Sequence, residues 1–318
     1  MHRIVVFSSW RTGVPAVLLA ALRSALAERD DFELSAICLP SAPPRAGPAR
    51  FLVDRLYAWL NRKRRPFRAV TPTTPRQWSR RHGVAVIYPE NGDFNAPAFA
   101  AKLQASFSPT TLFSVYCLQK LGPALLAAVS QTVNYHNGTL PAYRGLRATG
   151  WSLYNGEARS GFAFHRMTAE LDAGNILLSG SVPIAAADSA PDVEAAKAKA
   201  AADRLPELLD LLAAGALGAP QNGAASYYAK SDCDRITRIT EPSSLYRDEL
   251  LLRLRAFRAL DLRLGGKWYS VDLMEEIASN RQGNALCFQT ADGAWLAPTR
   301  IRSLPIPLYR LRSLLLRD

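Results

Sequence analysis

The stretch Gln131-Thr-Val-Asn-Tyr-His-Asn-Gly-Thr-Leu-Pro-Ala-Tyr-Arg-Gly145 decides the fold. Its first five residues have the short, β-rich pattern of a buried strand, and the Gly and Pro residues that follow predict a turn. Asn134 and His136 stand where this strand ends. In open α/β sheets, ligands bind at the carboxyl ends of the strands. The stretch therefore predicts an amide and an imidazole at a binding edge.

Similar short apolar runs precede this stretch and predict further strands at 3–8, 32–38, 83–88 and 111–116. Segments with helical spacing separate several of them, at 14–27, 96–103 and 123–129. This alternation predicts a Rossmann-like α/β fold, with a mostly parallel sheet and helices on both faces.

The pattern changes after an Ala/Leu-rich helix predicted over 193–214. A Gly- and Pro-containing break follows it, so we expect a first domain over residues 1–217 and a linker over 218–244. A small β-rich, open-barrel-like C-terminal domain is expected over 245–318. It would hold a helix at 245–260 and short strands at 267–271, 285–289 and 294–297.

A third polar residue, Asp172, follows Asn134 by 38 residues, in Glu170-Leu-Asp-Ala-Gly-Asn-Ile-Leu177. Asn134, His136 and Asp172 together supply the groups that acyl transfer needs. An amide N–H stabilises the negative carbonyl oxygen, and an imidazole beside a carboxylate moves protons near neutral pH. We expect the carboxylate to raise the pKa of His136 and to fix its orientation.

With these three residues, the chain resembles the 10-formyltetrahydrofolate-dependent formyltransferases, among them nucleotide-sugar N-formyltransferases and methionyl-tRNA formyltransferase. Further matches to the family pattern are Pro141, Tyr143-Arg144-Gly145, Gly156-Glu157, Gly161, His165, Met167, Gly174 and Ile176. The departures are Gly138 where the family usually has Ser, Thr139 where it has Leu, and Ala163 where it has Thr.

The resemblance implies transfer of a formyl group from N10-formyltetrahydrofolate to a primary amine, with Asn134, His136 and Asp172 as catalytic residues. It implies that the cofactor is bound at Gln119, Lys120, Leu121 and Gly174. It implies that the acceptor is bound at Ser9, Gly13, Tyr143 and Arg144, with the turn before residue 14 suited to a phosphate. His165 is expected to be structural, because it lies on an alternating strand pattern.

The composition bounds the remaining expectations. With 48% hydrophobic residues and no long uncharged apolar stretch, the chain is expected to be a cytoplasmic globular protein without a transmembrane segment. Cys38, Cys117, Cys233 and Cys287 have no metal-ligand spacing, so no metal is expected.

The net charge of +12 is concentrated in one segment. Ten Lys or Arg residues lie between residues 50 and 82, against Asp54 alone, and the densest part is 62–68. Such a run is typical of a solvated insertion or a weak membrane-surface contact; nucleic acid is the less favoured partner.

We expect the acceptor to be a small amine, with a nucleotide-linked amino sugar as the first choice. A tRNA acceptor is second, supported by the basic charge and the C-terminal domain. A non-catalytic folate- or nucleic-acid-binding protein and a hydrolase that uses water as acceptor are the remaining alternatives. A homodimer is compatible with the sequence.

Overall fold

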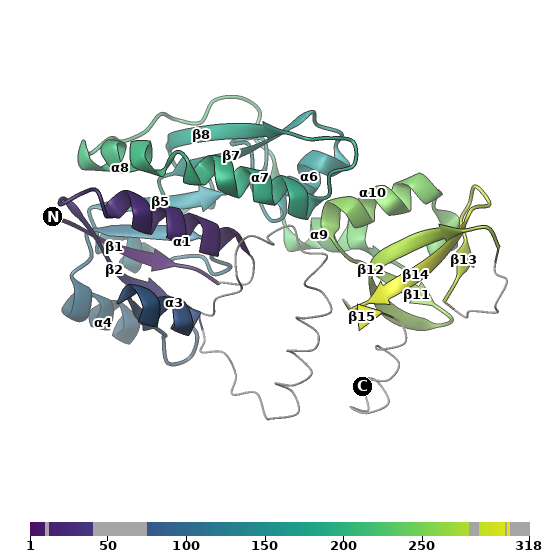
Figure 1. The fold of residues 1–318 in the computed structure, drawn as a ribbon, viewed down its shortest axis with the longest axis horizontal. Coiled ribbons are helices and arrows are strands. Elements are labelled where there is room, and N and C mark those ends of the chain that lie inside the picture. Colours follow the sequence, from purple (N-terminus) through teal and green to yellow (C-terminus); the bar gives the residue numbers. More distant parts are fainter. Residues whose placement is uncertain (10–12, 41–74, 280–285, 303, 306–318) are drawn as a thin grey trace.

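The structure is a computed structural model that describes residues 1–9, 13–40, 75–279, 286–302 and 304–305. The predicted basic segment 62–68 lies outside these residues. Two sheets dominate the described part of the chain, and they lie on opposite sides of the molecule in Figure 1.

The first sheet has seven strands in the order β3-β2-β1-β4-β5-β7-β8. Its strands are β1 (His2–Phe7), β2 (Phe32–Cys38), β3 (Ala85–Ile87), β4 (Thr111–Val115), β5 (Gln131–His136), β7 (Arg159–His165) and β8 (Ile176–Pro183). The first five are parallel to one another, whereas β7 runs antiparallel to both β5 and β8. The predicted mostly parallel α/β sheet is therefore confirmed.

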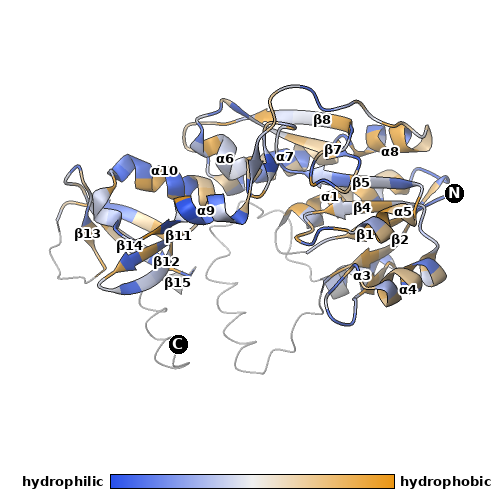
Figure 2. Ribbon diagram, turned by 180° about the vertical axis from the view of Figure 1, so that it is seen from behind, coloured by the Kyte–Doolittle hydropathy of each residue, from blue (hydrophilic) through white to orange (hydrophobic). Residues whose placement is uncertain are grey.

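Helices cover both faces of this sheet and bury its apolar side chains. Residues of α1 (Gly13–Leu26), α3 (Pro75–His82), α7 (Ala190–Ala202) and α8 (Leu205–Ala213) share one core with it. Residues of α4 (Pro97–Phe107) and α5 (Pro123–Ala127) share the other. Figure 2 shows the resulting contrast between mainly hydrophobic strands and helices of mixed hydropathy. This two-sided burial explains the near-continuous apolar runs of the parallel strands.

The single helix predicted over 193–214 is two helices. The chain breaks between α7 and α8 at residues 203–204, where α8 begins with Pro206 in its first turn. Proline lacks an N–H and its ring clashes with the preceding turn, so it starts a helix and does not continue one.

The segment predicted as a linker carries its own structure. It contains β9 (Tyr227–Tyr228), α9 (Lys230–Thr237), β10 (Arg238–Ile239) and the short 3-10 helix η2 (Pro242–Ser244). β9 pairs with β6 (Arg144–Gly145), which is followed by α6 (Ala148–Tyr154). This pairing ties the segment to the part of the chain that holds the seven-stranded sheet.

The C-terminal part is a mixed β-sheet covered by α10 (Arg247–Phe257). Its strands are β10, β11 (Leu260–Leu264), β12 (Lys267–Ile277), β13 (Phe288–Gln289), β14 (Trp295–Ile301) and β15 (Leu304–Pro305). The predicted helix 245–260 ends earlier, at Phe257, because Arg258 adopts a left-handed conformation with φ of 71°. Leu260 then starts β11.

Candidate active site

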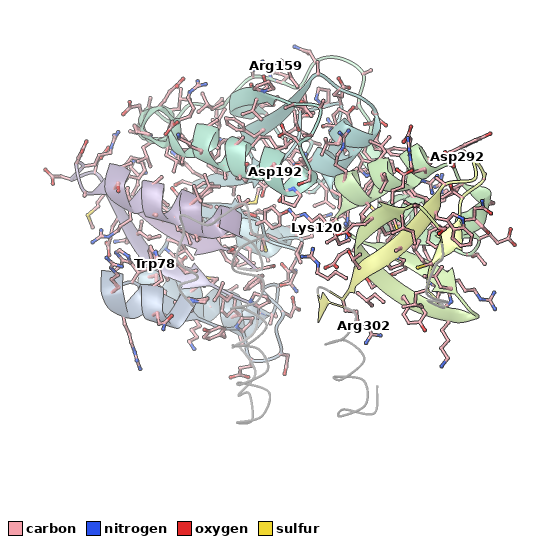
Figure 3. The ribbon with its side chains drawn as sticks, turned by 45° about the vertical axis from the view of Figure 1, so that its right-hand side comes forward. Trp78, Lys120, Arg159, Asp192, Asp292 and Arg302 are labelled. Carbon is pink, nitrogen blue, oxygen red and sulfur yellow. The ribbon has the colours of Figure 1, made fainter. Side chains whose placement is uncertain are left out.

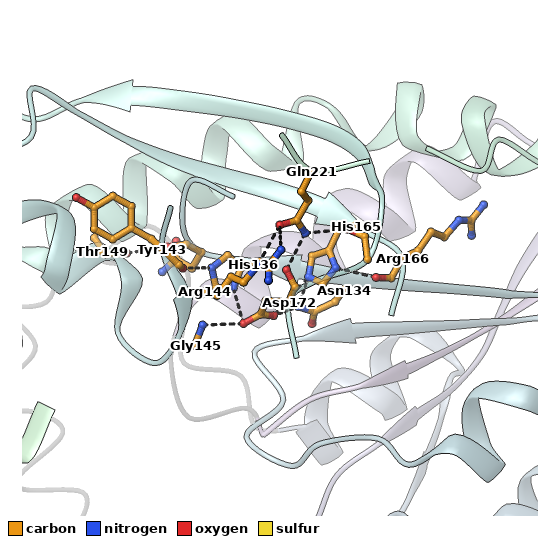
Figure 4. A network of polar contacts seen from close by, with 12 residues as sticks. Asn134, His136, Tyr143, Arg144, Gly145, Thr149, His165, Arg166, Asp172 and Gln221 are labelled. Carbon is orange, nitrogen blue, oxygen red and sulfur yellow. Dashed lines mark hydrogen bonds and ion pairs between the residues drawn. The ribbon is translucent and has the colours of Figure 1, made fainter. Parts of the chain in front are cut away.

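The antiparallel pairing of β5 with β7 builds the centre of the site. It places Asn134 directly opposite His165 and His136 opposite Ala163. Asp172 reaches the same place from the connection between β7 and β8, where its backbone has a positive φ of 54°. Figure 4 shows the four polar side chains converging. The three residues predicted to be catalytic are thus brought together.

His136 is held between a carbonyl and a carboxylate. Its Nε2 lies 2.6 Å from the carbonyl oxygen of Tyr143, and its Nδ1 lies 3.5 Å from Oδ2 of Asp172. A carbonyl oxygen only accepts, so Nε2 must carry a hydrogen and donate it. The neutral ring therefore turns an unprotonated Nδ1 toward Asp172.

The pKa of His136 is lowered, mainly because the ring is buried, with only 6% of the residue exposed. Asp172 raises it, but by less than burial lowers it. The expected effect of the carboxylate is therefore present, but the net shift is downward, because the cost of desolvation is not visible in the sequence pattern.

The carboxylate of Asp172 accepts hydrogen bonds at the centre of the site. Its Oδ2 accepts the backbone N–H of Gly145 at 2.9 Å, and its Oδ1 lies 3.5 Å from Nε2 of His165. Burial raises the pKa of the carboxyl, but His136, His165 and the Gly145 N–H outweigh it and lower the pKa to about 2. Asp172 is therefore an anion at neutral pH.

His165 belongs to this cluster, which its strand pattern did not indicate. Its Nδ1 lies 2.8 Å from the carbonyl oxygen of Arg166 and must donate, which leaves Nε2 of the neutral ring as an acceptor. The Nδ2 of Asn134 lies 3.0 Å from that Nε2 and 3.4 Å from Oδ1 of Asp172. Two acceptors therefore orient the amide of Asn134.

Arg144 and Gln221 support the loop that carries Asp172. The guanidinium of Arg144 donates to Oε1 of Gln221 at 2.8 and 3.1 Å and to Oε1 of Glu170 at 3.2 Å. Gln221 in turn donates to the carbonyl oxygens of Asp172 and Gly174, at 2.7 and 2.8 Å. Sequence reasoning missed Gln221, which lies in the segment predicted as a linker.

The residues predicted to bind the cofactor have different environments. Gln119 accepts the Phe94 N–H at 2.8 Å, and Leu121 is buried in the core, so their side chains stabilise the segment. Gly174 is packed so closely that a Cβ would lie 2.0 Å from the Arg166 carbonyl oxygen. Lys120 alone among the four lines a cleft; its position is marked in Figure 3.

This cleft has a volume of about 470 Å³, and its lining includes Glu170 and Leu171, the two residues that precede Asp172 in the sequence. Its lining residues are Lys120, Arg144, Ala169, Glu170, Leu171, Ala225, Ser226 and Tyr227. The lining joins the predicted cofactor segment and the predicted acceptor residue Arg144 to the segment that precedes Asp172. It therefore offers cationic, acidic and aromatic groups to a ligand near that carboxylate.

The other residues predicted to bind the acceptor are placed less directly. Ser9 accepts the Leu118 N–H at 3.0 Å through its hydroxyl, so it borders the predicted cofactor segment. Gly13 begins α1, while residues 10–12 of the predicted phosphate turn lie outside the described part of the chain. Tyr143 is 6% exposed and donates its hydroxyl to Glu157, so it contributes to the site through its carbonyl.

Gly138 leaves no room for a side chain. A Cβ at this position would lie 2.5 Å from Cβ of Ala148 and 2.8 Å from Nε2 of His136. The loop after β5 is therefore closely packed against the imidazole of His136.

Within the described ranges, no group of three or more His, Cys, Asp or Glu residues could hold a metal ion. None of the four cysteines, all of which lie in the described ranges, forms a disulfide. No helix in the described part of the chain is both long and apolar enough to cross a membrane.

Part of the chain is similar to known proteins. Residues 77–209 match the family described as formyl transferase. Over 127 residues the chain is 36% identical to the GDP-perosamine N-formyltransferases of Brucella melitensis and Brucella abortus, which covers 40% of this chain. The chain matches about half, 49%, of the length of these curated relatives.

Solved structures share the fold at low sequence identity. A sugar N-formyltransferase from Shewanella sp. superimposes with a TM-score of 0.60 at 18% identity, covering 88% of this chain and all of that one. HypX from Aquifex aeolicus, in complex with tetrahydrofolic acid, gives a TM-score of 0.58 at 16% identity, covering 94% of this chain and 44% of HypX.

Proposed function

We propose that this chain, whose residues 77–209 match the family described as formyl transferase, moves a formyl group from N10-formyltetrahydrofolate to the primary amine of a nucleotide-linked amino sugar. The convergence of Asn134, His136 and Asp172 carries the proposal, and a cleft lined by the residues just before Asp172 supports it. The products would be a sugar formamide and tetrahydrofolate.

Asn134 supplies the donor for the oxygen that becomes negative when the amine attacks the formyl carbon. Its two N–H groups face His165 and Asp172. The contact with Asp172 is the longer, at 3.4 Å, so it is the one released to the formyl oxygen. A donor fixed in this way lowers the barrier by roughly 3–4 kcal/mol.

Asp172 receives the proton that the attacking amine must lose. It is buried yet ionised, and His136 stands next to it with an unprotonated Nδ1. The proton is therefore shared between the carboxylate and the imidazole and is then returned to N10 as the bond between N10 and the formyl carbon breaks. Such positioned proton transfer contributes typically about 10²–10⁴-fold to a rate.

The two substrates would bind at different sides of the cleft. The segment with Gln119, Lys120 and Leu121 is fixed by side-chain hydrogen bonds to the neighbouring Asp93–Asn95 turn, which leaves a rigid backbone edge for a pterin ring. Arg144 and Tyr227 line the side toward β9 and suit an acceptor that carries negative charge and a sugar ring.

The amino-sugar acceptor is favoured by the named activity of the Brucella relatives, to which 127 residues of this chain are 36% identical. The decisive experiment incubates the purified chain with N10-formyltetrahydrofolate and GDP-perosamine, other nucleotide-linked amino sugars, initiator methionyl-tRNA, or no acceptor. Mass spectrometry detects the formamide, and a separate assay detects formate.

Formylation of a nucleotide-linked sugar that is abolished by Asp172→Asn would support the proposal. Formylation of tRNA alone, or formate release without an acceptor, would replace it with one of the alternatives. Binding of 5-formyltetrahydrofolate with no product from any acceptor would favour a non-catalytic folate-binding protein.

A further inference from the structure

Lys197 is a buried charged side chain that the proposed chemistry does not use. It lies in the middle of α7, on the face packed against the seven-stranded sheet, and none of it is exposed. Lysine is almost never fully buried without compensating partners. Its environment therefore calls for a role.

The Nζ of Lys197 is surrounded by four oxygens from three parts of the catalytic half. It donates to the carbonyl oxygens of Asn137 at 2.9 Å and Gly161 at 3.2 Å. It also contacts the hydroxyls of Thr149 at 2.7 Å and Ser160 at 2.9 Å. One side chain thus cross-links the loop after β5, helix α6 and strand β7.

The loop held in this way carries the catalytic imidazole. Asn137 directly follows His136, and its carbonyl also accepts the hydroxyl of Thr149 at 3.3 Å. Two residues later, the hydroxyl of Thr139 accepts the Gly161 N–H at 3.1 Å. Gly138 lies between Asn137 and Thr139, and a Cβ added to it would lie 2.8 Å from Nε2 of His136.

We propose that Lys197 is a positioning residue: by holding the Asn137 carbonyl, it fixes the loop against His136 and so keeps Nδ1 of the imidazole aimed at Asp172. This inference rests on the proposed function only for its effect on turnover. Its structural part, the orientation of the His136 ring, is independent of which substrate the protein uses.

The low pKa of Lys197 is compatible with this role. Burial lowers it to about 7, and Glu194, one turn earlier on α7, raises it only partly. Either protonation state retains N–H groups that donate to Asn137. A nearby positive charge also disfavours the imidazolium form of His136, whose pKa is lowered in part by Lys197.

The test compares Lys197→Met with Glu194→Gln. Both change buried polar residues on the same helix, but Glu194 contacts Tyr116 and Arg258 and none of the loop oxygens. Turnover is counted per folate-binding site, so that a loss of folded protein does not register. We expect kcat to fall at least about 10-fold in Lys197→Met with both KM values within about threefold, because displaced catalytic groups lose rate steeply. Glu194→Gln should stay within about threefold of wild type.

A second readout is the NMR signal of the His136 Nε2–H in the chain labelled with ¹⁵N-histidine, which contains four histidines. We expect it to shift or broaden in Lys197→Met, while the His165 Nδ1–H signal stays in place. If Lys197→Met does not fold, Thr149→Val, which removes one of the four oxygens, should still move the His136 signal.

An unchanged His136 signal in the folded variant would overturn the inference, as would an unchanged kcat in an active protein. If wild type formylates no acceptor but the His136 signal moves as expected, the proposed function fails and the positioning role stands.

Discussion

His136 donates its Nε2 hydrogen to the carbonyl oxygen of Tyr143, 2.6 Å away, and this contact selects the tautomer of the imidazole. The opposite ring nitrogen then faces Asp172 without a hydrogen of its own. The donor, the proton acceptor and the orienting groups of the site are therefore defined before any substrate binds. This preorganisation leads to several predictions.

Removing any of the three convergent groups should abolish most of the activity. We expect Asp172→Asn, His136→Ala and Asn134→Ala each to lower kcat by at least about 100-fold while the chain stays folded. Steady-state kinetics with a validated acceptor and circular dichroism check this. Near-wild-type rates in any two of the variants would rule out the mechanism.

His136 should titrate below its ordinary pKa of 6.5, because burial outweighs the effect of Asp172. In Asp172→Asn the pKa should fall further, since the group that raises it is lost. NMR titration of the ¹⁵N-histidine-labelled chain measures both values. The denatured protein serves as the reference, and a His136 pKa above 6.5 would contradict the prediction.

Folding stability should rise with pH because of Lys197. Its folded-state pKa of about 7 lies below the ordinary 10.5. Between these values the unfolded chain holds a proton that the folded chain lacks, so the free energy of unfolding increases with pH, by up to about 1.4 kcal/mol per pH unit. Urea unfolding across this window should show the rise in wild type and a smaller rise in Lys197→Met. Equal pH dependence in the two proteins would refute the shift.

Restoring the usual family residue at position 138 should be harmful in this chain. A side chain in Gly138→Ser would collide with Ala148, His136 and the Tyr143 carbonyl, because its Cβ would lie within 2.9 Å of each. We expect a loss of about 1–3 kcal/mol in stability, together with reduced kcat. Thermal unfolding and kinetics test this, and a fully active variant of unchanged stability would show that the loop adapts.

The basic segment 62–68 should discriminate between acceptors. Replacing Arg62, Lys63, Arg64 and Arg65 with Ser should leave kcat for an amino sugar within a few-fold, because clustered solvated charges act mainly through a salt-screened field. For a tRNA acceptor the same change should weaken binding and reduce its salt dependence. KM measured at several salt concentrations with both acceptors distinguishes the two cases, and a large loss of kcat on the sugar would place the segment in the active site.

The strands of the parallel sheet could be predicted from the sequence, because their apolar runs are long and bounded by turns. It did not reveal the role of His165, because an alternating strand pattern does not specify which neighbour the strand pairs with. Only the antiparallel register opposite β5 places His165 against Asn134.

The sign of the His136 pKa shift and the proposed role of Lys197 could not be predicted from the sequence, for a related reason. Both depend on how completely α6, α7 and the loop after β5 enclose these side chains. Burial of this kind is a property of the assembled layers, so no local spacing encodes it.

Phe257 bears on where this chain can be divided. It lies at the end of α10, is 1% exposed and packs edge-on against Trp151 of α6, with ring centroids 5.0 Å apart. Its carbonyl accepts a hydrogen bond from Arg147, which precedes that helix. A fragment that ends at the predicted boundary, residue 244, therefore lacks Phe257, which packs against α6. Recombinant fragments of the N-terminal half that stop there would expose Trp151 of α6 to solvent. Fragments that continue through Arg258 would keep Phe257 packed against it.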